Sequence, residues 1–273
     1  MHRLPDTAVI YVQEKSAEWF NDVNFWEQYA PIMFDDAHWA EVPAAADGIT
    51  HLFRLNQYSD SPLSTNPKVL DLCCGFGRIS AELSRRGFAV TGVDITESYL
   101  CTAREEAAYE NLDIEYVNAD ARDFVRPQFF DAAVNLYISF GYFKDPADDK
   151  KLLANVYESL KDGGSFIIET LGKEIAVRDF VQAEWFERAG FTVLTEYEAL
   201  DSWSLLKNRW ILIKDGKKIE KTFTQRLYAA SELRTLLHEA GFAKVEIYGD
   251  WDERPYDRGS SKLIAVGRKG IRD

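Results

Sequence analysis

The chain has few cysteines, no long apolar run and no extended basic tract, and each of these absences narrows its function. Three cysteines occur among 273 residues, and none of them forms a C-x-x-C pair, so no disulfide framework is expected. No stretch approaches the ~18 uninterrupted apolar residues of a membrane span. The N-terminus also lacks the basic and apolar segments of a secretory signal. We therefore predict a cytoplasmic protein that does not enter a membrane.

The net charge is strongly acidic. The 32 basic and 45 acidic residues give a formal charge of −13, which repels nucleic-acid backbones and anionic membranes. Hydrophobic residues make up 46% of the chain and aromatic residues 14%, which is enough for a core and an aromatic-lined pocket. This composition favours a soluble protein that binds a small molecule and no nucleic acid.

The spacing of apolar and aromatic residues divides the chain into three kinds of segment. Residues 1–60 are predicted to form an N-terminal helical lid, because aromatic side chains recur there at helical spacing. Over 61–273, short apolar runs alternate with helical stretches, which predicts a parallel sheet covered by helices. An insertion at 172–230 interrupts this alternation and contains a hairpin signal at Asp215-Gly216. The last two strands are joined by a loop alone, so we expect them to pair antiparallel at one edge of the sheet.

A glycine-containing turn follows the first strand in "VLDLCCGFGR", Val69 to Arg78. In an open parallel sheet this turn lies closest to the ligand, and glycine lets the backbone approach without a Cβ. The dinucleotide fingerprint needs a third glycine, where this chain has Ser80. No G-K-[ST] follows either, so a P-loop is excluded.

Acidic residues close the next two strands. Asp94 ends "AVTGVD", where a carboxylate can accept hydrogen bonds from both hydroxyls of a ribose, and Asp120 ends "IEYVNAD", where it can accept from an adenine amino group. A dinucleotide site needs only the first of these acids. Aspartate is also a common helix cap, but the two acids and the glycine turn in this order indicate an adenosine site.

Residues 68–171 resemble the core of the class I S-adenosylmethionine-dependent methyltransferases. "VLDLCCGFGR" is similar to that family's D-x-G-x-G-x-G motif with Cys73 at its first glycine, "VTGVDIT" to its ribose-binding loop and "NADARDF" to its adenine-binding loop. The resemblance implies a Rossmann-like, doubly wound α/β fold with a mostly parallel seven-stranded sheet. It also implies S-adenosyl-L-methionine as cofactor, S-adenosyl-L-homocysteine as product, and these cofactor-binding residues: Asp71, Cys73, Gly75, Gly77, Asp94, Ile95, Asp120, Ala121 and Asn135. The resemblance does not cover residues 1–60, but we expect Tyr11 and Tyr29 of the lid to fold over the cofactor.

Methyl transfer from a sulfonium is an in-line displacement, for which alignment and desolvation are the main requirements. A general base is needed only where the attacked group must lose a proton. Tyr137 and Tyr142 follow the fourth strand and are candidates for the catalytic site, although they would also fit in the core. His38 is a candidate base, and the alternative is that it is an exposed surface histidine. No metal-binding constellation is evident. We predict that one wall of the substrate pocket, the substrate wall, consists of Phe140, Arg209, Arg226, Tyr228 and Tyr256. The alternative is that the hairpin forms a homodimer contact.

Two other functions remain open from the sequence. An NAD(P)- or FAD-dependent oxidoreductase begins with the same strand, turn and helix, although Ser80, Asp120 and the antiparallel terminal pair speak against it. A non-catalytic module that senses S-adenosylmethionine or its demethylated product would share the cofactor residues. The segment Asn135-Leu136-Tyr137-Ile138 lacks the prolines typical of nucleic-acid amino-methyltransferases. The favoured prediction is an N- or O-methyltransferase that acts on a small-molecule acceptor.

Overall fold

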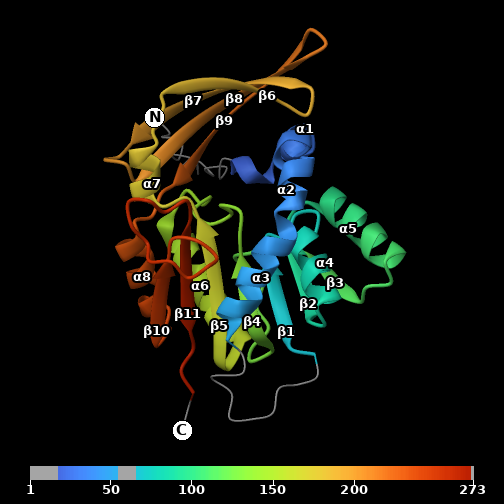
Figure 1. The fold of residues 1–273 in the computed structure, drawn as a ribbon, viewed down its shortest axis with the longest axis vertical. Helices are drawn as coiled ribbons and strands as arrows, with labels where there is room; N and C mark the ends of the chain where they lie inside the picture. Colours follow the sequence, from blue (N-terminus) through green and yellow to red (C-terminus); the bar gives the residue numbers. More distant parts are fainter. Residues whose placement is uncertain (1–17, 55–65, 272–273) are drawn as a thin grey trace, which may run out of the picture.

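The main body of the protein is a seven-stranded sheet with the strand order β10-β11-β5-β4-β1-β2-β3 (Figure 1). The computed structural model describes residues 18–54 and 66–271. All neighbouring strands are parallel except β11, which runs antiparallel to both β5 and β10. This confirms the predicted fold class and the antiparallel terminal pair. The strands are β1 (Lys68–Leu72), β2 (Ala89–Asp94), β3 (Ile114–Asn118), β4 (Phe130–Asn135), β5 (Leu160–Thr170), β10 (Lys244–Tyr248) and β11 (Leu263–Arg268).

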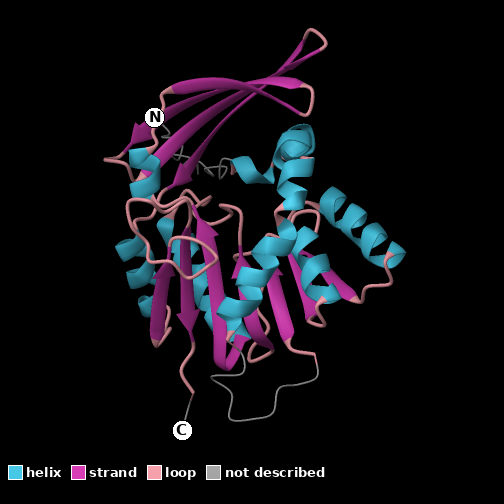
Figure 2. Ribbon diagram, viewed as in Figure 1, coloured by secondary structure: helices cyan, strands magenta, loops and turns pink. Residues whose placement is uncertain are grey.

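Helices pack on both faces of this sheet (Figure 2). Successive residues of a strand point to opposite faces, and β1 follows this rule. Val69 packs with α3 and α4, whereas Leu70 and Leu72 pack in the core that holds α6 and α8. The helices of the main body are α3 (Val42–Phe53), α4 (Arg78–Arg85), α5 (Glu97–Tyr109), α6 (Pro146–Ser159) and α8 (Ala230–Glu239).

The predicted helical N-terminal segment contains a short 3-10 helix η1 (Trp19–Asn21), α1 (Val23–Met33), α2 (Asp36–Ala40) and α3. Asp22 and Asp35 cap α1 and α2 by accepting backbone N–H groups, as N-terminal aspartates commonly do. Because α3 packs on the main sheet, η1, α1 and α2 are the elements of residues 18–54 that can cover the carboxyl ends of the strands. Residue 60, the predicted boundary of the lid, lies outside the described residues.

The insertion forms a second sheet of four antiparallel strands in the order β6-β7-β8-β9. They are β6 (Ala183–Arg188), β7 (Phe191–Leu200), β8 (Leu205–Lys214) and β9 (Lys217–Arg226), preceded by α7 (Lys173–Arg178). The predicted hairpin is confirmed between β8 and β9, where Asp215 and Gly216 have φ values of 50° and 73°. The first two strands of this sheet were not predicted.

The second sheet and α1 together form a cover, hereafter the roof, above the carboxyl ends of the main strands (Figure 1). Phe25, Tyr29 and Ile32 of α1 are buried against Val193 and Leu212 of the second sheet. The Tyr29 hydroxyl also donates to the backbone oxygen of Trp210 at 2.9 Å. Segments more than 150 residues apart therefore share one hydrophobic core. Within the described ranges, no helix has the length and apolarity that crossing a membrane requires.

The packing of the glycine turn is tested by Gly77→Ala. Gly77 has a φ of 72°, and a Cβ there would overlap the hydroxyl group of Tyr116. Gly87 has a φ of 90° but open space around its Cβ position, so Gly87→Ala carries only the backbone strain. We expect Gly77→Ala to lower the free energy of unfolding by ~1–3 kcal/mol more than Gly87→Ala, because overpacking adds to the strain. Urea denaturation measures this difference, and equal losses in the two variants would contradict the packing role.

Candidate active site

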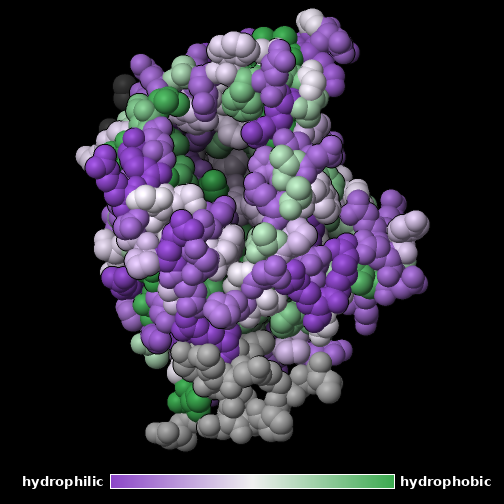
Figure 3. Space-filling view, viewed as in Figure 1, coloured by the Kyte–Doolittle hydropathy of each residue, from purple (hydrophilic) through white to green (hydrophobic). Residues whose placement is uncertain are grey.

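A cavity of about 780 Å³ lies between the carboxyl ends of the main strands and the roof. Figure 3 shows the molecule hollowed at this level, beneath the second sheet. The volume falls within the ~300–1,000 Å³ typical of small-molecule sites. The lid, the glycine turn, the loops after β2, β3 and β4, and the inner face of the second sheet all contribute side chains to it.

The glycine turn forms one wall of the cavity, through Asp71, Cys73 and Gly75. Cys73 takes the place of a family glycine and still has a left-handed backbone, with a φ of 62°. Burial, followed by the charge of Asp94, raises the pKa of the Cys73 thiol well above its ordinary value, so the thiol stays protonated. Gly77 does not line the cavity, and its place in the turn is explained by the contact with Tyr116.

Asp71 is a buried carboxyl group behind this turn. It is 3% exposed, and its Oδ2 accepts a hydrogen bond of 2.6 Å from the Ser80 hydroxyl. Burial raises the pKa of Asp71 to about 6, although the Ser80 hydrogen bond acts in the opposite direction. Ser80, which departs from the dinucleotide fingerprint, is thus the hydrogen-bond partner of a carboxyl group near the end of β1, one residue before the strand ends at Leu72.

Asp94 joins the glycine turn to the loop after β2. One carboxylate oxygen accepts from the Gly75 N–H and the other from the Thr96 N–H, each at 2.8 Å. A carboxylate offers about four acceptor positions, so about two remain for the hydroxyls of a ligand. Burial raises the pKa of Asp94 in spite of these backbone hydrogen bonds. Ile95, the next residue, also lines the cavity.

Asp120 and Ala121 line the cavity after β3, but Asp120 already has a partner. Both of its oxygens accept from the guanidinium of Arg122, at 2.6 to 3.1 Å. Burial alone would raise the pKa of Asp120, but the hydrogen bonds and charge of Arg122 outweigh it and lower the pKa. Arg122 also pairs with Glu18 of the lid at 2.7 Å. Sequence reasoning missed this arginine, and its contacts leave Asp120 little capacity to accept from an adenine.

The loop after β4 has an unusual backbone. Tyr137 and Ile138 both have left-handed φ values, 53° and 62°, a conformation that costs energy outside glycine and often marks functional sites. Glu169 holds this loop, since its carboxylate accepts from the Tyr137 N–H at 2.6 Å. The Gln225 amide donates to the Ile138 oxygen at 3.1 Å. The guanidinium of Arg78 lies 3.7 Å from the centre of the Tyr137 ring.

The roof contributes alternate residues of its strands to the cavity, among them Asn208 and Trp210 of β8 and Phe223 and Gln225 of β9. Asn208 is 5% exposed and Gln225 7%. Each uses its NH₂ group to donate to a backbone oxygen, of Leu206 and Ile138 respectively. Within the described ranges their amide oxygens accept no hydrogen bond, so they are available to a ligand. Neither residue can be identified from the sequence alone, because the alternation of a strand does not reveal which of its two faces points inward.

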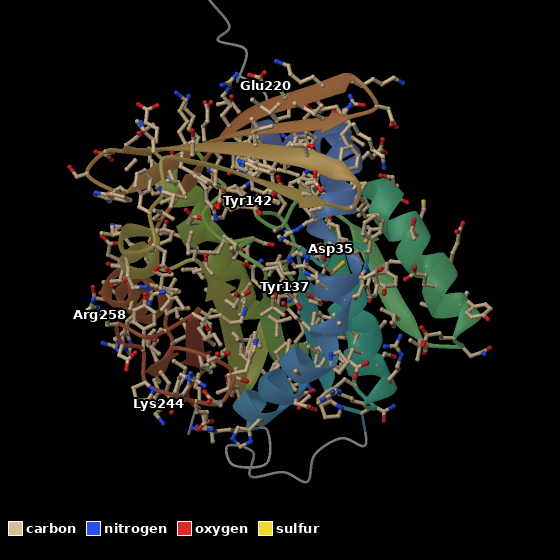
Figure 4. The ribbon with its side chains drawn as sticks, turned by 45° about the horizontal axis from the view of Figure 1, so that its top comes forward. Asp35, Tyr137, Tyr142, Glu220, Lys244 and Arg258 are labelled. Carbon is tan, nitrogen blue, oxygen red and sulfur yellow. The ribbon has the colours of Figure 1, made fainter. Side chains whose placement is uncertain are left out.

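The three catalytic candidates all line the cavity. The Tyr142 ring packs 4.7 Å from Trp19 and 6.2 Å from Trp26. Figure 4 shows Tyr137, Tyr142 and Asp35 around the space beneath the second sheet, whereas Glu220 lies on the outer side of that sheet. The His38 ring nitrogen Nδ1 lies 2.5 Å from Asp35.

The predicted substrate wall does not form, because its members point elsewhere. Arg209 lies on the outer face of the second sheet, where it pairs with two glutamates at 2.8 Å each. The Tyr228 hydroxyl donates to the buried Asp149 at 2.7 Å, and Arg226 Nε lies 4.0 Å from the same carboxylate. Phe140 is buried in the main core against Tyr228.

Further predicted residues also lie outside the cavity. The Tyr256 hydroxyl donates to Glu174 at 3.0 Å, which corrects its assignment to the substrate wall. Asn135 is fully buried and its amide ties β4 to β1 through the Leu72 oxygen at 3.0 Å. Tyr29 belongs to the core of the roof instead of contacting a cofactor. Tyr11 lies outside the described residues.

Comparisons with known proteins agree with this architecture. Residues 69–164 match the model of a methyltransferase domain family. A glycine/sarcosine N-methyltransferase from Aphanothece halophytica is 29% identical over 74% of this chain and 76% of its own length. A methyltransferase structure from Clostridium acetobutylicum superposes with a TM-score of 0.72 at 18% identity, over 90% of this chain and 98% of that one. An amino pentose methyltransferase from Micromonospora echinaspora, solved with S-adenosylmethionine bound, has a TM-score of 0.62 at 18% identity and covers 90% and 96%.

The fold is the Rossmann-like architecture predicted from the sequence, and its cavity lies at the carboxyl ends of the main strands. The family match over residues 69–164, the methyltransferase relatives and the shared fold support the predicted class I S-adenosylmethionine-dependent methyltransferase. The methyltransferase family match and relatives support S-adenosylmethionine as the cofactor, and the residues that line the cavity fit that molecule. The unused acceptor positions of Asp94 suit ribose hydroxyls, and apolar side chains such as Ile95 and Phe143 suit a purine.

The ribose assignment is tested by Asp94→Ala. Removal of the carboxylate leaves two backbone N–H groups and the ligand hydroxyls without an acceptor, so the affinity for S-adenosylhomocysteine should fall by ~1–3 kcal/mol. Isothermal titration calorimetry measures this change. Asp123→Ala, which removes an exposed carboxylate paired with Lys151 on the loop after β3, is the control and should bind as the wild type does. Unchanged affinity in Asp94→Ala would contradict the assignment.

The buried charge of Asp71 predicts a pH dependence of stability. Its folded-state pKa of about 6 lies above the ordinary 3.8, so the folded protein binds this proton more tightly than the unfolded chain does. The ionised group therefore costs stability as the pH rises from about 4 to about 6, on the order of 3 kcal/mol. Asp71→Asn retains an acceptor for Ser80 and lacks the charge.

Urea denaturation of both proteins between pH 4 and pH 7 isolates this effect. The stability of Asp71→Asn relative to the wild type should improve as the pH rises through that window. A difference that stays constant with pH would show that the Asp71 pKa is not raised in the folded state.

Proposed function

We propose that this methyltransferase transfers the methyl group to the nitrogen of a small, polar amine. The observation that carries the proposal is the roofed cavity with the amide oxygens of Asn208 and Gln225 available in it. Hydrogen-bond acceptors in a mostly buried site favour a ligand that brings N–H or O–H donors. A roofed site also suits a small acceptor better than a macromolecule.

The named relatives support nitrogen as the attacked atom. The glycine/sarcosine N-methyltransferase matches about three quarters of this chain, and the amino pentose methyltransferase matches nine tenths of it in fold. Both proteins, by their names, methylate small amines. Both likenesses extend well beyond residues 69–164, the range that the family model matches.

We further propose which residues hold the cofactor. Asp94 accepts from the ribose, and Gly75 lets the backbone approach the amino-acid end. Arg78 supplies a cation there: it is 4% exposed, lines the cavity and donates one hydrogen bond of 2.9 Å to the His38 backbone oxygen. A guanidinium with unused donors is suited to a carboxylate. Asp120 acts indirectly, by holding Arg122.

Alignment and desolvation are the tasks of this chain in the reaction. S-adenosylmethionine, when bound, supplies a methyl group already activated by its sulfonium charge. The aromatic rings of Trp19, Trp26 and Tyr142 offer faces that attract such a positive charge. Asn208 and Gln225 orient the acceptor nitrogen through its N–H donors. Because a protonated amine has no free lone pair, it must lose a proton before it attacks.

An acceptor panel tests the proposal. The wild-type protein is incubated with S-adenosylmethionine and either amines (glycine, sarcosine, amino sugars) or their hydroxyl analogues, and the products are analysed by mass spectrometry. We expect N-methylated products from at least one amine and none from the hydroxyl analogues. Methylation of the hydroxyl analogues alone would make O-methylation the function.

The role of the roof is tested by Asn208→Ala. Loss of one hydrogen bond to the acceptor should lower kcat/KM for the amine by ~0.5–1.5 kcal/mol, mainly through KM. Lys207→Ala is the matched control, because Lys207 points to the outer face of the same strand and pairs with Glu198 at 2.9 Å. A kcat/KM equal in Asn208→Ala and Lys207→Ala would contradict the contact.

A further inference from the structure

The lid places a histidine and an aspartate together at the wall of the cavity. We propose that His38 is the base that removes the proton of the acceptor amine, and that Asp35 is the positioning residue that orients its imidazole. This inference rests on the proposed amine methylation. Nothing in the family motifs assigns a role to Asp35, which lies outside the matched residues 69–164.

The geometry defines which nitrogen of His38 is free. Asp35 Oδ1 lies 2.5 Å from His38 Nδ1, and the same oxygen accepts the His38 backbone N–H at 3.1 Å. An ionised carboxylate can only accept hydrogen bonds, so the ring proton belongs on Nδ1. The second nitrogen, Nε2, then carries the lone pair. His38 lines the cavity and its side chain is 30% exposed, which gives a released proton a route to solvent.

Helix capping alone does not explain this arrangement. Asp22 caps α1 and Asp145 caps α6 through the backbone N–H groups of Asn24 and Ala147, and neither of these two aspartates contacts a histidine ring. Asp35 does so, and it meets a second partner as well. Arg188 of β6, another cavity residue, lies 3.3 Å from Asp35 Oδ2. The carboxylate is therefore held from the lid and from the second sheet at once.

The surrounding charges keep Asp35 ionised. Burial would raise its pKa, but the hydrogen bonds from the backbone and ring of His38, together with the charge of Arg188, outweigh burial and lower it. Other charged residues of the same cavity include Arg78, whose guanidinium donates to the His38 backbone oxygen, and Glu41.

The proton and electron balance of the step is simple. His38 Nε2 takes a proton from the ammonium, and the electron pair of that N–H bond stays on nitrogen. The nitrogen pair then forms the new N–CH₃ bond, while the pair of the old S–CH₃ bond remains on sulfur. The imidazolium, stabilised by Asp35, returns its proton to solvent before the next turnover.

Asp35→Asn separates the two roles of Asp35, which caps α2 and orients the His38 imidazole. Asparagine caps helices about as well as aspartate, but it lacks the negative charge that orients the ring. We expect kcat with the fastest amine of the panel to fall at least ~10-fold, and His38→Gln to lose ~10²–10⁴-fold, the usual contribution of a general base. The affinity for S-adenosylhomocysteine should stay within about twofold, since neither residue is assigned to the cofactor. Asp145→Asn makes the same exchange at the cap of α6 and should leave kcat unchanged.

A second readout does not depend on turnover. Nitrogen-15 NMR of the histidine side chains, with the His38 signal assigned by its loss in His38→Gln, reports which ring nitrogen carries the proton. We expect Nδ1–H in the wild-type protein and a shift towards Nε2–H in Asp35→Asn. An Nε2–H tautomer in the wild type, or an unchanged kcat in Asp35→Asn, would overturn the proposal.

The two proposals fail in different ways. A wild-type protein that methylates only the hydroxyl analogues overturns the amine function and, with it, the removal of an ammonium proton. A wild-type protein that methylates amines while His38→Gln retains full kcat leaves the amine function standing and overturns the role of His38 and Asp35.

Discussion

The contact between α1 and the second sheet is the constraint on which the site depends. Phe25, Tyr29 and Ile32 are buried against the second sheet, and this shared core holds the roof above the main strands. Without it, the carboxyl ends of the strands would open to solvent, and a polar acceptor would compete with water for every hydrogen bond. The roof thus encloses the carboxyl ends of the main strands in a cavity, which has room for the methyl acceptor beside the proposed cofactor.

The loops at the carboxyl ends of the main strands form the floor of the cavity, and a few hydrogen-bond acceptors and donors of this floor have no partner among the residues that the structure describes. Asp94 satisfies two backbone N–H groups and retains free lone pairs, whereas Asp120 is fully engaged by Arg122. The strained loop at Tyr137 is held by Glu169 from below and Gln225 from above. Such mutual support is expected where a backbone conformation of high energy must be kept in place. It also links the shape of the floor to the position of the roof.

Local sequence patterns were enough to predict the main sheet and its helices. The residues that line the cavity from the second sheet could not be predicted, because their positions depend on contacts between segments distant in sequence. The apolar runs, the glycine turn and Asp94 could be identified because each depends on a few neighbouring residues. Arg209 was assigned to a substrate wall, yet it points to the outer face of β8, whereas its neighbour Trp210 points to the inner face and lines the cavity. Which residues of β8 face the cavity depends on which face of the second sheet α1 covers, and α1 lies about 180 residues away in the sequence. Arg122 was missed for a similar reason, since its value lies in partners that tertiary folding brings to it.

The decisive measurement is a crystal structure with S-adenosylhomocysteine bound. We expect the ribose hydroxyls within hydrogen-bond distance of Asp94, the amino-acid carboxylate near Arg78 and the sulfur facing the space beneath Asn208. A nucleoside bound elsewhere, or one whose sulfur points away from the roof, would contradict this arrangement.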